Sequence, residues 1–326
     1  MSYNTRDHLL DCVASVYRAG AGGVIVVDNA SNDGSPEAVL GAFPQVRLIR
    51  ASSNLGYGAA ANLGWRASSA PLVAVANPDL VVSEGALARL RLVLENDPRL
   101  ALVGPRLENP DGSLYPSARR FPALTDAAGH AFIGWVRPHN RFSRRYKMLD
   151  EAYDQSRPGA GIDLVTTGPG PVADVGTPME PAARHDVVSH SESVTGPVRE
   201  VDWVSGAFFV ARRFALEALG GFDEGYFMYM EDVDLCWRAR RAGWRVAYVP
   251  RALVTHHQGA ASGNHPYRMA IAHHKSLARY AWRTTQGADR AALPAVAVAV
   301  ALRCGLALLR QAIGDHRGGP HRAGPS

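Results

Sequence analysis

Short apolar runs alternate with helix-like segments through the first half of the chain, and this alternation constrains the fold most strongly. The apolar runs contain β-branched residues, as buried parallel strands do. We predict strands over residues 24–27, 46–49 and 72–76, and helices over residues 9–19, 35–42 and 56–68. This order predicts an α/β fold, a doubly wound, mostly parallel sheet with helices on both faces. Ligands then bind at the carboxyl ends of the strands.

The second half is expected to continue this architecture after an irregular stretch. Residues 151–200 hold six glycines, six prolines and a single aromatic residue, Tyr153, which is typical of a mobile insertion. Regular secondary structure is expected again from Val201 onward. We predict a strand pair or a bent strand over residues 201–210, a helix over 231–241, and strands over 246–249 and 252–255. In the first half, Ser35 is expected to cap its helix, with Pro36 at the first helical position.

Composition places the chain among soluble globular proteins. Its 326 residues are 47% hydrophobic and 20% charged, enough for one large α/β domain or two modest ones. The formal net charge of +5 fits an acidic substrate, an anionic membrane surface or a plain solvated surface, and no dense basic stripe indicates nucleic acid. The three cysteines are far apart, which favours a reducing cytoplasm over a disulfide framework or a zinc site. The polar residues 2–8 predict no signal peptide.

Residues 291–309 are apolar apart from Arg303. Nineteen residues barely reach the length of a membrane span, and a charged side chain is costly in lipid. We therefore expect a helix that lies on the membrane or docks on the domain. Residues 315–326 are expected to be disordered.

Three polar motifs follow predicted strands. Asp28 begins the run 28–34, where a carboxylate at a strand end could accept hydrogen bonds from a nucleobase or a ribose; a plain strand-to-helix turn explains the run equally. Residues 54–58 contain two glycines before a helix, which suits a diphosphate, although the small residues there could simply allow close packing. Residues 77–79 place Asp79 on a short turn, where it could hold Mg²⁺ or Mn²⁺ or cap a helix.

The acidic run at Glu231 is the strongest signal. Three acids in four residues follow an aromatic stretch, and carboxylates beside apolar surface are costly without a task or a partner. Asp234 has Arg238 one turn later, which predicts a helix salt bridge. Glu231 and Asp232 remain as candidates for the general base that a group transfer to a hydroxyl needs.

His256 and His257 stand beside a glycine after a predicted strand. Imidazole is a ligand for Mn²⁺ and a donor to phosphate, whereas a lone histidine is usually structural. The pair therefore indicates either a metal or phosphate contact or an ordinary structural role.

In this order, the motifs resemble glycosyltransferase family 2, which has the GT-A fold. The asparagine-proline-aspartate turn and the aromatic run before Glu231 resemble its rhamnosyltransferase-like branch especially. The matching stretches, which reach from residue 2 to residue 262, are 2–4, 28–34, 54–64, 77–79, 203–207, 221–224, 231–238 and 256–262.

The resemblance implies a role for each matching position. Asp232 would be the general base, and Glu231 would support it or position the acceptor. Asp79 would bind Mg²⁺ or Mn²⁺ with His256, which would contact the metal or the diphosphate. Asn77 stands where many relatives carry the first acid of an Asp-X-Asp motif, which lowers the negative charge of the site. The implied donor-binding residues are Tyr3, Asn4, Asp28 at the nucleobase, Asn54, Gly56, Asn77, and Gly206 and Ala207 at the sugar pocket.

The resemblance also implies a domain organisation and a setting. Residues 1–125 would be the nucleotide-sugar-binding half, 126–200 a variable region, 201–285 the acceptor-binding and catalytic half, and 286–326 an apolar helix with a tail. Relatives begin with an apolar strand before the serine-tyrosine-asparagine stretch, so we expect several apolar residues upstream of Met1. The protein is expected to be cytoplasmic and peripheral on the inner face of the cell membrane.

The expected function is inverting transfer of a sugar, with L-rhamnose from a dTDP donor as the favoured case, to a lipid-linked or polysaccharide acceptor in cell-envelope synthesis. The alternative is a catalytically silent module that only binds a sugar nucleotide; the retained Asp79, Glu231 and Asp232 argue against it. A Rossmann-type oxidoreductase is excluded because Asp28-Asn29, and no Gly-X-Gly-X-X-Gly, follows the first strand.

Overall fold

The computed structural model of the protein describes residues 1–121, 197–259 and 266–317. The helices are α1 (Arg6–Arg18), α2 (Ser35–Ala42), α3 (Tyr57–Arg66), α4 (Ala86–Asn96), α8 (Arg213–Leu219), α9 (Glu231–Arg241), α10 (Pro266–Thr284), the 3₁₀ helix η1 (Gly287–Ala292) and α11 (Leu293–Arg317). The strands are β1 (Ile25–Asp28), β2 (Arg47–Arg50), β3 (Leu72–Ala76), β4 (Leu80–Val82), β5 (Leu100–Glu108), β6 (Leu114–Tyr115), β7 (Ala118–Arg119), β8 (Arg199–Glu200), β9 (Trp203–Val204), β10 (Phe208–Arg212) and β11 (Arg245–His256).

The main sheet has seven strands, five of them in the order β3-β10-β5-β11-β4, and β1 and β2 form a separate parallel pair. β5 and β11 are parallel, whereas β10 is antiparallel to both neighbours and β4 is antiparallel to β11. These antiparallel strands depart from the pattern that strand-helix alternation predicts. β4 follows β3 without an intervening helix, and it lies at the opposite end of the strand order, paired with β11.

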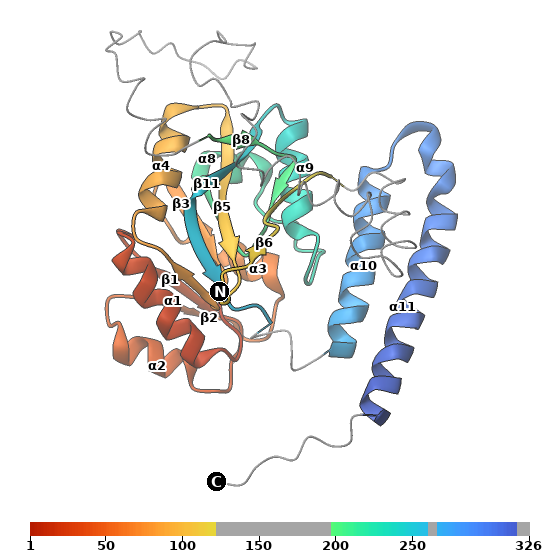
Figure 1. Cartoon of the computed structure of the whole chain (residues 1–326), viewed down its shortest axis with the longest axis horizontal. Coiled ribbons are helices and arrows are strands. Elements are labelled where there is room, and N and C mark those ends of the chain that lie inside the picture. Colours follow the sequence, from red (N-terminus) through yellow and green to blue (C-terminus); the bar gives the residue numbers. More distant parts are fainter. Residues whose placement is uncertain (122–196, 260–265, 318–326) are drawn as a thin grey trace.

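Both faces of the main sheet are covered (Figure 1). Successive side chains of a strand point to opposite faces, and β10 shows this directly. Phe208 and Val210 pack into the core beneath α1 and α4, whereas Phe209 and Ala211 pack into the core beneath α3, α8 and α9. The continuous apolar sequence of the central strands therefore reflects burial on both faces.

Several predicted elements have the observed bounds, including α2, β3 and α9. The predicted cap of α2 is wrong. Gly34 precedes the helix in a left-handed conformation, and Ser35 is the first helical residue. The Ser35 hydroxyl donates to Asp33 Oδ1 at 2.6 Å instead of capping a backbone N–H, because Asp33 already lies within reach in the tight turn.

The strands predicted over residues 246–249 and 252–255 form one long strand, β11. Its register with β5 shifts between Val249 and Leu253, around Pro250, which has no N–H for the ladder. Residues 201–210 form β9 and the start of β10, with Gly206 in the turn between them. The insertion predicted over residues 151–200 lies outside the described residues apart from its end, where Arg199–Glu200 pairs with β11.

The last two long helices form an antiparallel pair beside the α/β unit (Figure 1). α10 attaches to that unit through polar contacts: the Ser276 hydroxyl donates to the carbonyl of Met228 at 2.8 Å, and Arg279 and Arg283 each lie 2.9 Å from Asp223 Oδ2. α11 extends the predicted apolar helix to residue 317, so residues 315–317 are helical where disorder was expected. The remainder of the predicted tail lies outside the described residues.

The first two residues lie between β1 and β3. Ser2 donates its N–H to the carbonyl of Val27 and forms a parallel bridge with Asp28, while the amino group of Met1 donates to the carbonyl of Ala76 at 3.3 Å. This arrangement carries Tyr3 to the carboxyl edge of both strands.

Candidate functional site

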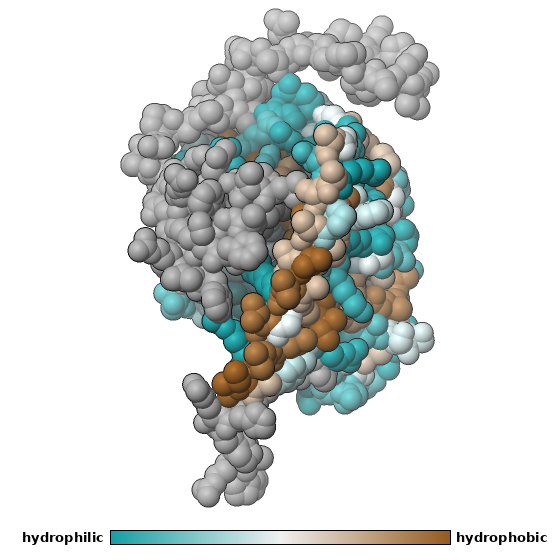
Figure 2. Space-filling model, turned by 90° about the vertical axis from the view of Figure 1, so that its right-hand side faces the viewer, coloured by the Kyte–Doolittle hydropathy of each residue, from teal (hydrophilic) through white to brown (hydrophobic). Residues whose placement is uncertain are grey.

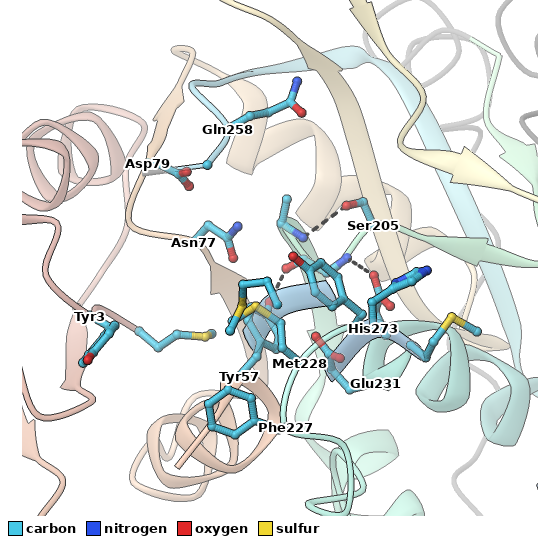
Figure 3. A pocket seen from close by; sticks show the side chains of 18 of the residues that line it. Tyr3, Tyr57, Asn77, Asp79, Ser205, Phe227, Met228, Glu231, Gln258 and His273 are labelled. Carbon is cyan, nitrogen blue, oxygen red and sulfur yellow. Dashed lines mark hydrogen bonds between the residues drawn. The ribbon is translucent and has the colours of Figure 1, made fainter. Parts of the chain in front are cut away.

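A cavity of about 550 Å³ opens at the carboxyl ends of β1 and β3 and the amino end of α9. Figure 3 shows Tyr3 at one side, Asp79 and Gln258 at another, and His273 beside Glu231 opposite Tyr3. The predicted site residues that line this cavity are Tyr3, Asn54, Asn77, Asp79, Gly206, Ala207, Glu231, Asp232 and His256. Asn4, Asp28 and Gly56 do not line it.

Asp79 and His256 are held together by neighbouring strands. His256 is in register with Leu80 across β4 and β11, and the next residue, His257, donates its N–H to the carbonyl of Asp79 at 2.9 Å. His256 Nε2 consequently lies 3.3 Å from Asp79 Oδ1, with both side chains buried. Within the described ranges, no third histidine, cysteine, aspartate or glutamate joins this pair to form a metal-binding cluster.

The turn before β10 places the backbone of Gly206 and Ala207 beside β3. The Asn77 N–H donates to the carbonyl of Ala207 at 2.8 Å, which continues the β3–β10 ladder into the site. The Asn77 side chain points into the space between Asp79 and Tyr3 (Figure 3). Asn77 therefore occupies the floor of the cavity, next to the carboxylate that sequence analysis assigned to the metal.

Asp232 is fixed by two backbone N–H groups. Gly206 donates to its Oδ2 at 2.8 Å, and Val233 donates to its Oδ1 at 2.9 Å. A Cβ atom at Gly206 would lie 3.0 Å from the Cβ of Asp232, tighter than most real contacts of this kind. Glycine at position 206 thus allows the backbone to approach the carboxylate closely enough to donate to it.

Glu231 and Asp232 are adjacent buried acids with different surroundings. Burial raises the pKa of both carboxyl groups, and the charge of Asp232 raises the pKa of Glu231 further. The N–H donors from Gly206 and Val233 and the charge of Arg119 act in the other direction on the pKa of Asp232. Glu231 Oε2, in contrast, has no hydrogen-bond partner among the described residues. The negative charge of the pair therefore favours Asp232, as a general base requires.

The backbone before α9 turns sharply. Tyr229 and Met230 have φ angles of 68° and 67°, and consecutive non-glycine residues in the left-handed region are uncommon. Such strain persists only where the surroundings enforce it, and it clusters at functional sites. Here the turn starts α9 so that Glu231 and Asp232 both line the cavity.

Tyr57 is a site residue that sequence analysis missed. Its hydroxyl donates to the carbonyl of Gly206, and its ring packs edge-on against Phe222 with centroids 5.8 Å apart. Burial and the charges of Glu231 and Asp232 raise the pKa of Tyr57 well above its usual value, so the phenol stays neutral. Tyr57 begins a helix rich in small residues, a pattern that indicates close packing. The only sequence feature that connected Tyr57 with the site was its position inside the glycine-containing motif 54–58.

Gly56 contributes through packing. Its φ is +86°, and an added Cβ would lie 2.2 Å from the carbonyl oxygen of Phe227. The Tyr57 N–H donates to that same oxygen at 2.8 Å, which ties the start of α3 to the aromatic run before α9. Asn54, by contrast, lines the cavity, and its Oδ1 accepts from Asn29 Nδ2 at 2.9 Å.

Asp28 is buried behind the cavity lining. Its Oδ2 accepts from the Ser31 N–H at 3.1 Å, while its Oδ1 has no hydrogen-bond partner among the described residues. Asn4 supports the same loop, since its N–H donates to Ser31 Oγ at 3.0 Å and its Oδ1 accepts from the Asn32 N–H. Both side chains thus order the loop beside Tyr3, and the assignment of Asp28 to the nucleobase stays a prediction.

The far side of the cavity is built largely from residues outside the sequence motifs, together with Trp203 of the stretch 203–207. Arg119 lies over the ring of Trp203, with its guanidinium carbon 5.0 Å from the ring centroid. α10 contributes Arg268, Met269 and His273. These residues come from segments distant in sequence, so their convergence follows from tertiary structure alone.

Comparison with known proteins agrees with the fold. A family model described as glycosyl transferase family 2 matches residues 1–163, and one described as glycosyltransferase-like family 2 matches residues 172–272. The N-acetylglucosaminyl-diphospho-decaprenol L-rhamnosyltransferase of Mycobacterium tuberculosis is 36% identical over 289 residues, covering 85% of this chain and 80% of that protein. Rhamnosyltransferase WbbL of Escherichia coli is 47% identical over 57 residues, which cover 18% of this chain and 22% of that protein.

A solved mannosyltransferase from Pyrobaculum calidifontis, in complex with GDP-Man and Mn²⁺, superposes with a TM-score of 0.51 at 17% identity, covering 100% of this chain and 74% of that one. The α/β fold is that of a GT-A glycosyltransferase. The chain belongs to glycosyltransferase family 2. The predicted family, fold class and enzyme class are thereby confirmed.

Proposed function

We propose that the protein is an inverting rhamnosyltransferase. It would move L-rhamnose from a dTDP donor to an N-acetylglucosamine carried on a polyprenyl diphosphate, in the synthesis of cell-envelope glycan. The acceptor is inferred from the Mycobacterium tuberculosis relative, whose similarity extends over most of both chains. The observation that supports turnover over silent binding is the Asp232 carboxylate, held by two N–H donors at the cavity wall.

The proposed reaction is a single displacement. The acceptor hydroxyl attacks the anomeric carbon of the donor, the bond from that carbon to the diphosphate breaks, and Asp232 takes the hydroxyl proton. The nucleotide would lie on the side of Tyr3, which lines the cavity opposite His273 (Figure 3). The hydroxyl attacks the face of the sugar opposite the leaving diphosphate, so a single displacement inverts the anomeric configuration.

The pair Asp79 and His256 fits a divalent cation, Mg²⁺ or Mn²⁺, because a carboxylate oxygen and an imidazole nitrogen face the same cavity 3.3 Å apart. Such an ion would supply positive charge to the leaving diphosphate. With only two protein ligands of this kind in the described part of the chain, the donor itself would complete the coordination.

Asp79→Ala should weaken donor binding only when the metal is present, since the carboxylate acts through the ion. Isothermal titration of the sugar nucleotide, with Mn²⁺ and then with EDTA, measures this. Wild type and variant should differ in Mn²⁺ and agree in EDTA, and EDTA should abolish wild-type activity. Asp111→Ala is the matched control, because Asp111 is an exposed carboxylate outside the cavity. Full wild-type activity in EDTA would rule out the metal.

A peripheral membrane contact through α11 is part of the proposal. Gly287–Ile313 contains an 18-residue stretch with a mean hydropathy of 2.1, of which 6% is buried, so the segment is long and apolar enough to cross a membrane by length and composition. Its exposed large side chains recur at helical spacing, and they give the apolar surface seen in Figure 2. This stripe comprises Val298, Leu302, Leu306, Leu309 and Ile313, which are 43–65% exposed. An apolar stripe with basic residues suits reversible attachment to an anionic surface.

A chain that ends at Asp289 should stay folded and bind donor, because α10 attaches to the α/β unit independently of α11. It should lose co-sedimentation with anionic liposomes and activity on a lipid-linked acceptor, while it keeps activity on a short soluble analogue. Leu302→Gln/Leu306→Gln in the full chain should reproduce the loss. Aggregation or unfolding of the shortened chain would instead place α11 in the core of the fold and end the membrane proposal.

A panel of labelled sugar nucleotides tests the proposed specificity. With Mn²⁺ and a polyprenyl-diphosphate-linked N-acetylglucosamine, label should pass to the lipid from dTDP-rhamnose and from neither UDP-N-acetylglucosamine nor GDP-mannose. Transfer from one of the other donors would retain the enzyme class and reject the rhamnosyl assignment.

A further inference from the structure

Two nitrogen-bearing side chains of α10, Arg268 and His273, line the cavity. Arg303 belongs to α11, the helix that packs antiparallel against α10. Burial, with smaller contributions in the same direction from His274 and the charge of Arg303, lowers the pKa of His273 to about 4. His273 is consequently neutral at physiological pH and can donate one N–H, while the two arginines carry the positive charge.

These groups have no acidic partners in the part of the chain that the structure describes. No ion pair links Arg268 or Arg303 to a described carboxylate, and no described residue forms a hydrogen bond with the ring nitrogens of His273. Elsewhere in the fold, arginines such as Arg279 and Arg283 have carboxylate partners. Guanidinium groups that no described carboxylate neutralises, beside a cavity, are suited to a phosphate-bearing ligand.

Arg303 is the one charged residue in the apolar stretch 291–309, and it is less exposed than the apolar side chains beside it. Its neighbours on the outer face, Leu302 and Leu306, are 65% and 53% exposed, whereas Arg303 is only partly exposed and lies near His273. The charge that would be costly in lipid therefore points away from the apolar stripe. Sequence analysis treated Arg303 as a cost, whereas its partial burial on α11 leaves it beside α10, the helix that carries Arg268 and His273.

The antiparallel pairing places the end of α10 that lines the cavity beside the second half of α11. α10 begins at the lower end of the helix pair in Figure 1, where α11 ends, so its first turns lie beside the second half of α11. Figure 2 shows the hydrophobic surface concentrated over this same half. A molecule with a charged head and an apolar tail could reach the cavity here without leaving the lipid surface.

We propose that Arg268, His273 and Arg303 form the subsite for the diphosphate of the lipid-linked acceptor. The acceptor sugar would then extend toward Asp232, and the polyprenyl chain would leave along the apolar stripe of α11. This inference rests on the proposed function, because it assigns a part of the acceptor to a part of the same cavity. Under this proposal, residues outside the family motifs determine the specificity for a diphosphate-linked acceptor.

The test compares two acceptors on the full-length protein. One is N-acetylglucosamine on a polyprenyl diphosphate, and the other is octyl N-acetylglucosaminide, which has an apolar tail and no phosphate. Arg268→Gln/Arg303→Gln should raise KM for the diphosphate acceptor about tenfold or more, because each lost charge-assisted contact weakens binding. Activity on the neutral acceptor, KM for the donor and the melting temperature should stay within about twofold or a few degrees of wild type.

Arg310→Gln is the matched control, since it removes an arginine from the same helix at an exposed position outside the cavity. It should leave both acceptors nearly unchanged. Equal losses on both acceptors, an unchanged double variant, or an equal loss with Arg310→Gln would each overturn the subsite. Failure of wild type to use either acceptor would count against the proposed function instead.

A binding measurement examines the subsite without turnover. Wild type should co-sediment more strongly with neutral vesicles that contain polyprenyl diphosphate than with vesicles that contain the uncharged polyprenol. The double variant should lose this preference while retaining its basal sedimentation. Persistence of the preference in the double variant would contradict the subsite even if the protein proved inactive.

Discussion

Asp232→Asn should reduce glycosyl transfer by roughly 10²-fold or more while leaving the fold and donor binding intact. The amide keeps the shape of the carboxylate, and its one carbonyl oxygen can accept the N–H of either Gly206 or Val233, so one of these two hydrogen bonds is lost. It cannot take the proton of the acceptor hydroxyl at neutral pH. Steady-state kinetics with saturating donor and acceptor, beside a titration of the donor, separate these effects.

Glu231→Gln is the informative comparison. Burial and Asp232 raise the pKa of Glu231, so this residue is expected to act mainly in its neutral form. Its amide analogue should consequently lose much less activity than Asp232→Asn. Near-normal turnover of Asp232→Asn, or a larger loss in Glu231→Gln, would move the base to another residue.

Arg238→Ala should destabilise the protein by about 3–5 kcal/mol, because it leaves a buried carboxylate without its main partner. Arg238 Nε lies 2.7 Å from Asp234 Oδ2, and the Asp234 side chain is 0% exposed. The same guanidinium donates to the carbonyls of Leu219 and Gly221. Urea unfolding monitored by circular dichroism measures the change in the free energy of unfolding.

The chain offers a matched control for this ion pair. Arg91 and Glu95 form another i,i+4 pair in a helix, but their side chains are 69% and 51% exposed. Arg91→Ala should cost less than about 1 kcal/mol, since water screens an exposed pair. A similar loss of stability in both variants would show that burial of Asp234 does not set the strength of the interaction.

Because Asp234 lies in the first turn of α9, loss of its partner should also disturb Glu231 and Asp232.

Local patterns were sufficient for much of the fold and for one wall of the cavity. The apolar run of β3 and the amphipathic run of α9 predicted these elements with their observed bounds, because hydrophobic period depends on local burial. The salt bridge from Asp234 to Arg238 also followed from helical spacing and is confirmed at 2.7 Å. The turns that end strands brought most of the predicted polar residues to one cavity.

The opposite wall depended on contacts that no local pattern specifies. Tyr57 reaches Gly206 across 149 residues of sequence, and α10 docks on the segment before α9 through Ser276. The direction of Arg303 likewise depends on which face of α11 packs against α10. Apolar residues that recur every 3.6 positions predict a helix with an apolar and a polar face, but tertiary packing decides what each face contacts.

The most direct test of the central claim is the anomeric configuration of the product. Wild-type protein is incubated with dTDP-L-rhamnose, Mn²⁺ and N-acetylglucosamine on a polyprenyl diphosphate, and the new linkage is determined by NMR. A rhamnosylated lipid whose anomeric configuration is opposite to that of the donor is predicted, and Asp232→Asn should yield almost none. Donor binding without any product, or a product that retains the donor configuration, would contradict a single displacement with Asp232 as the base.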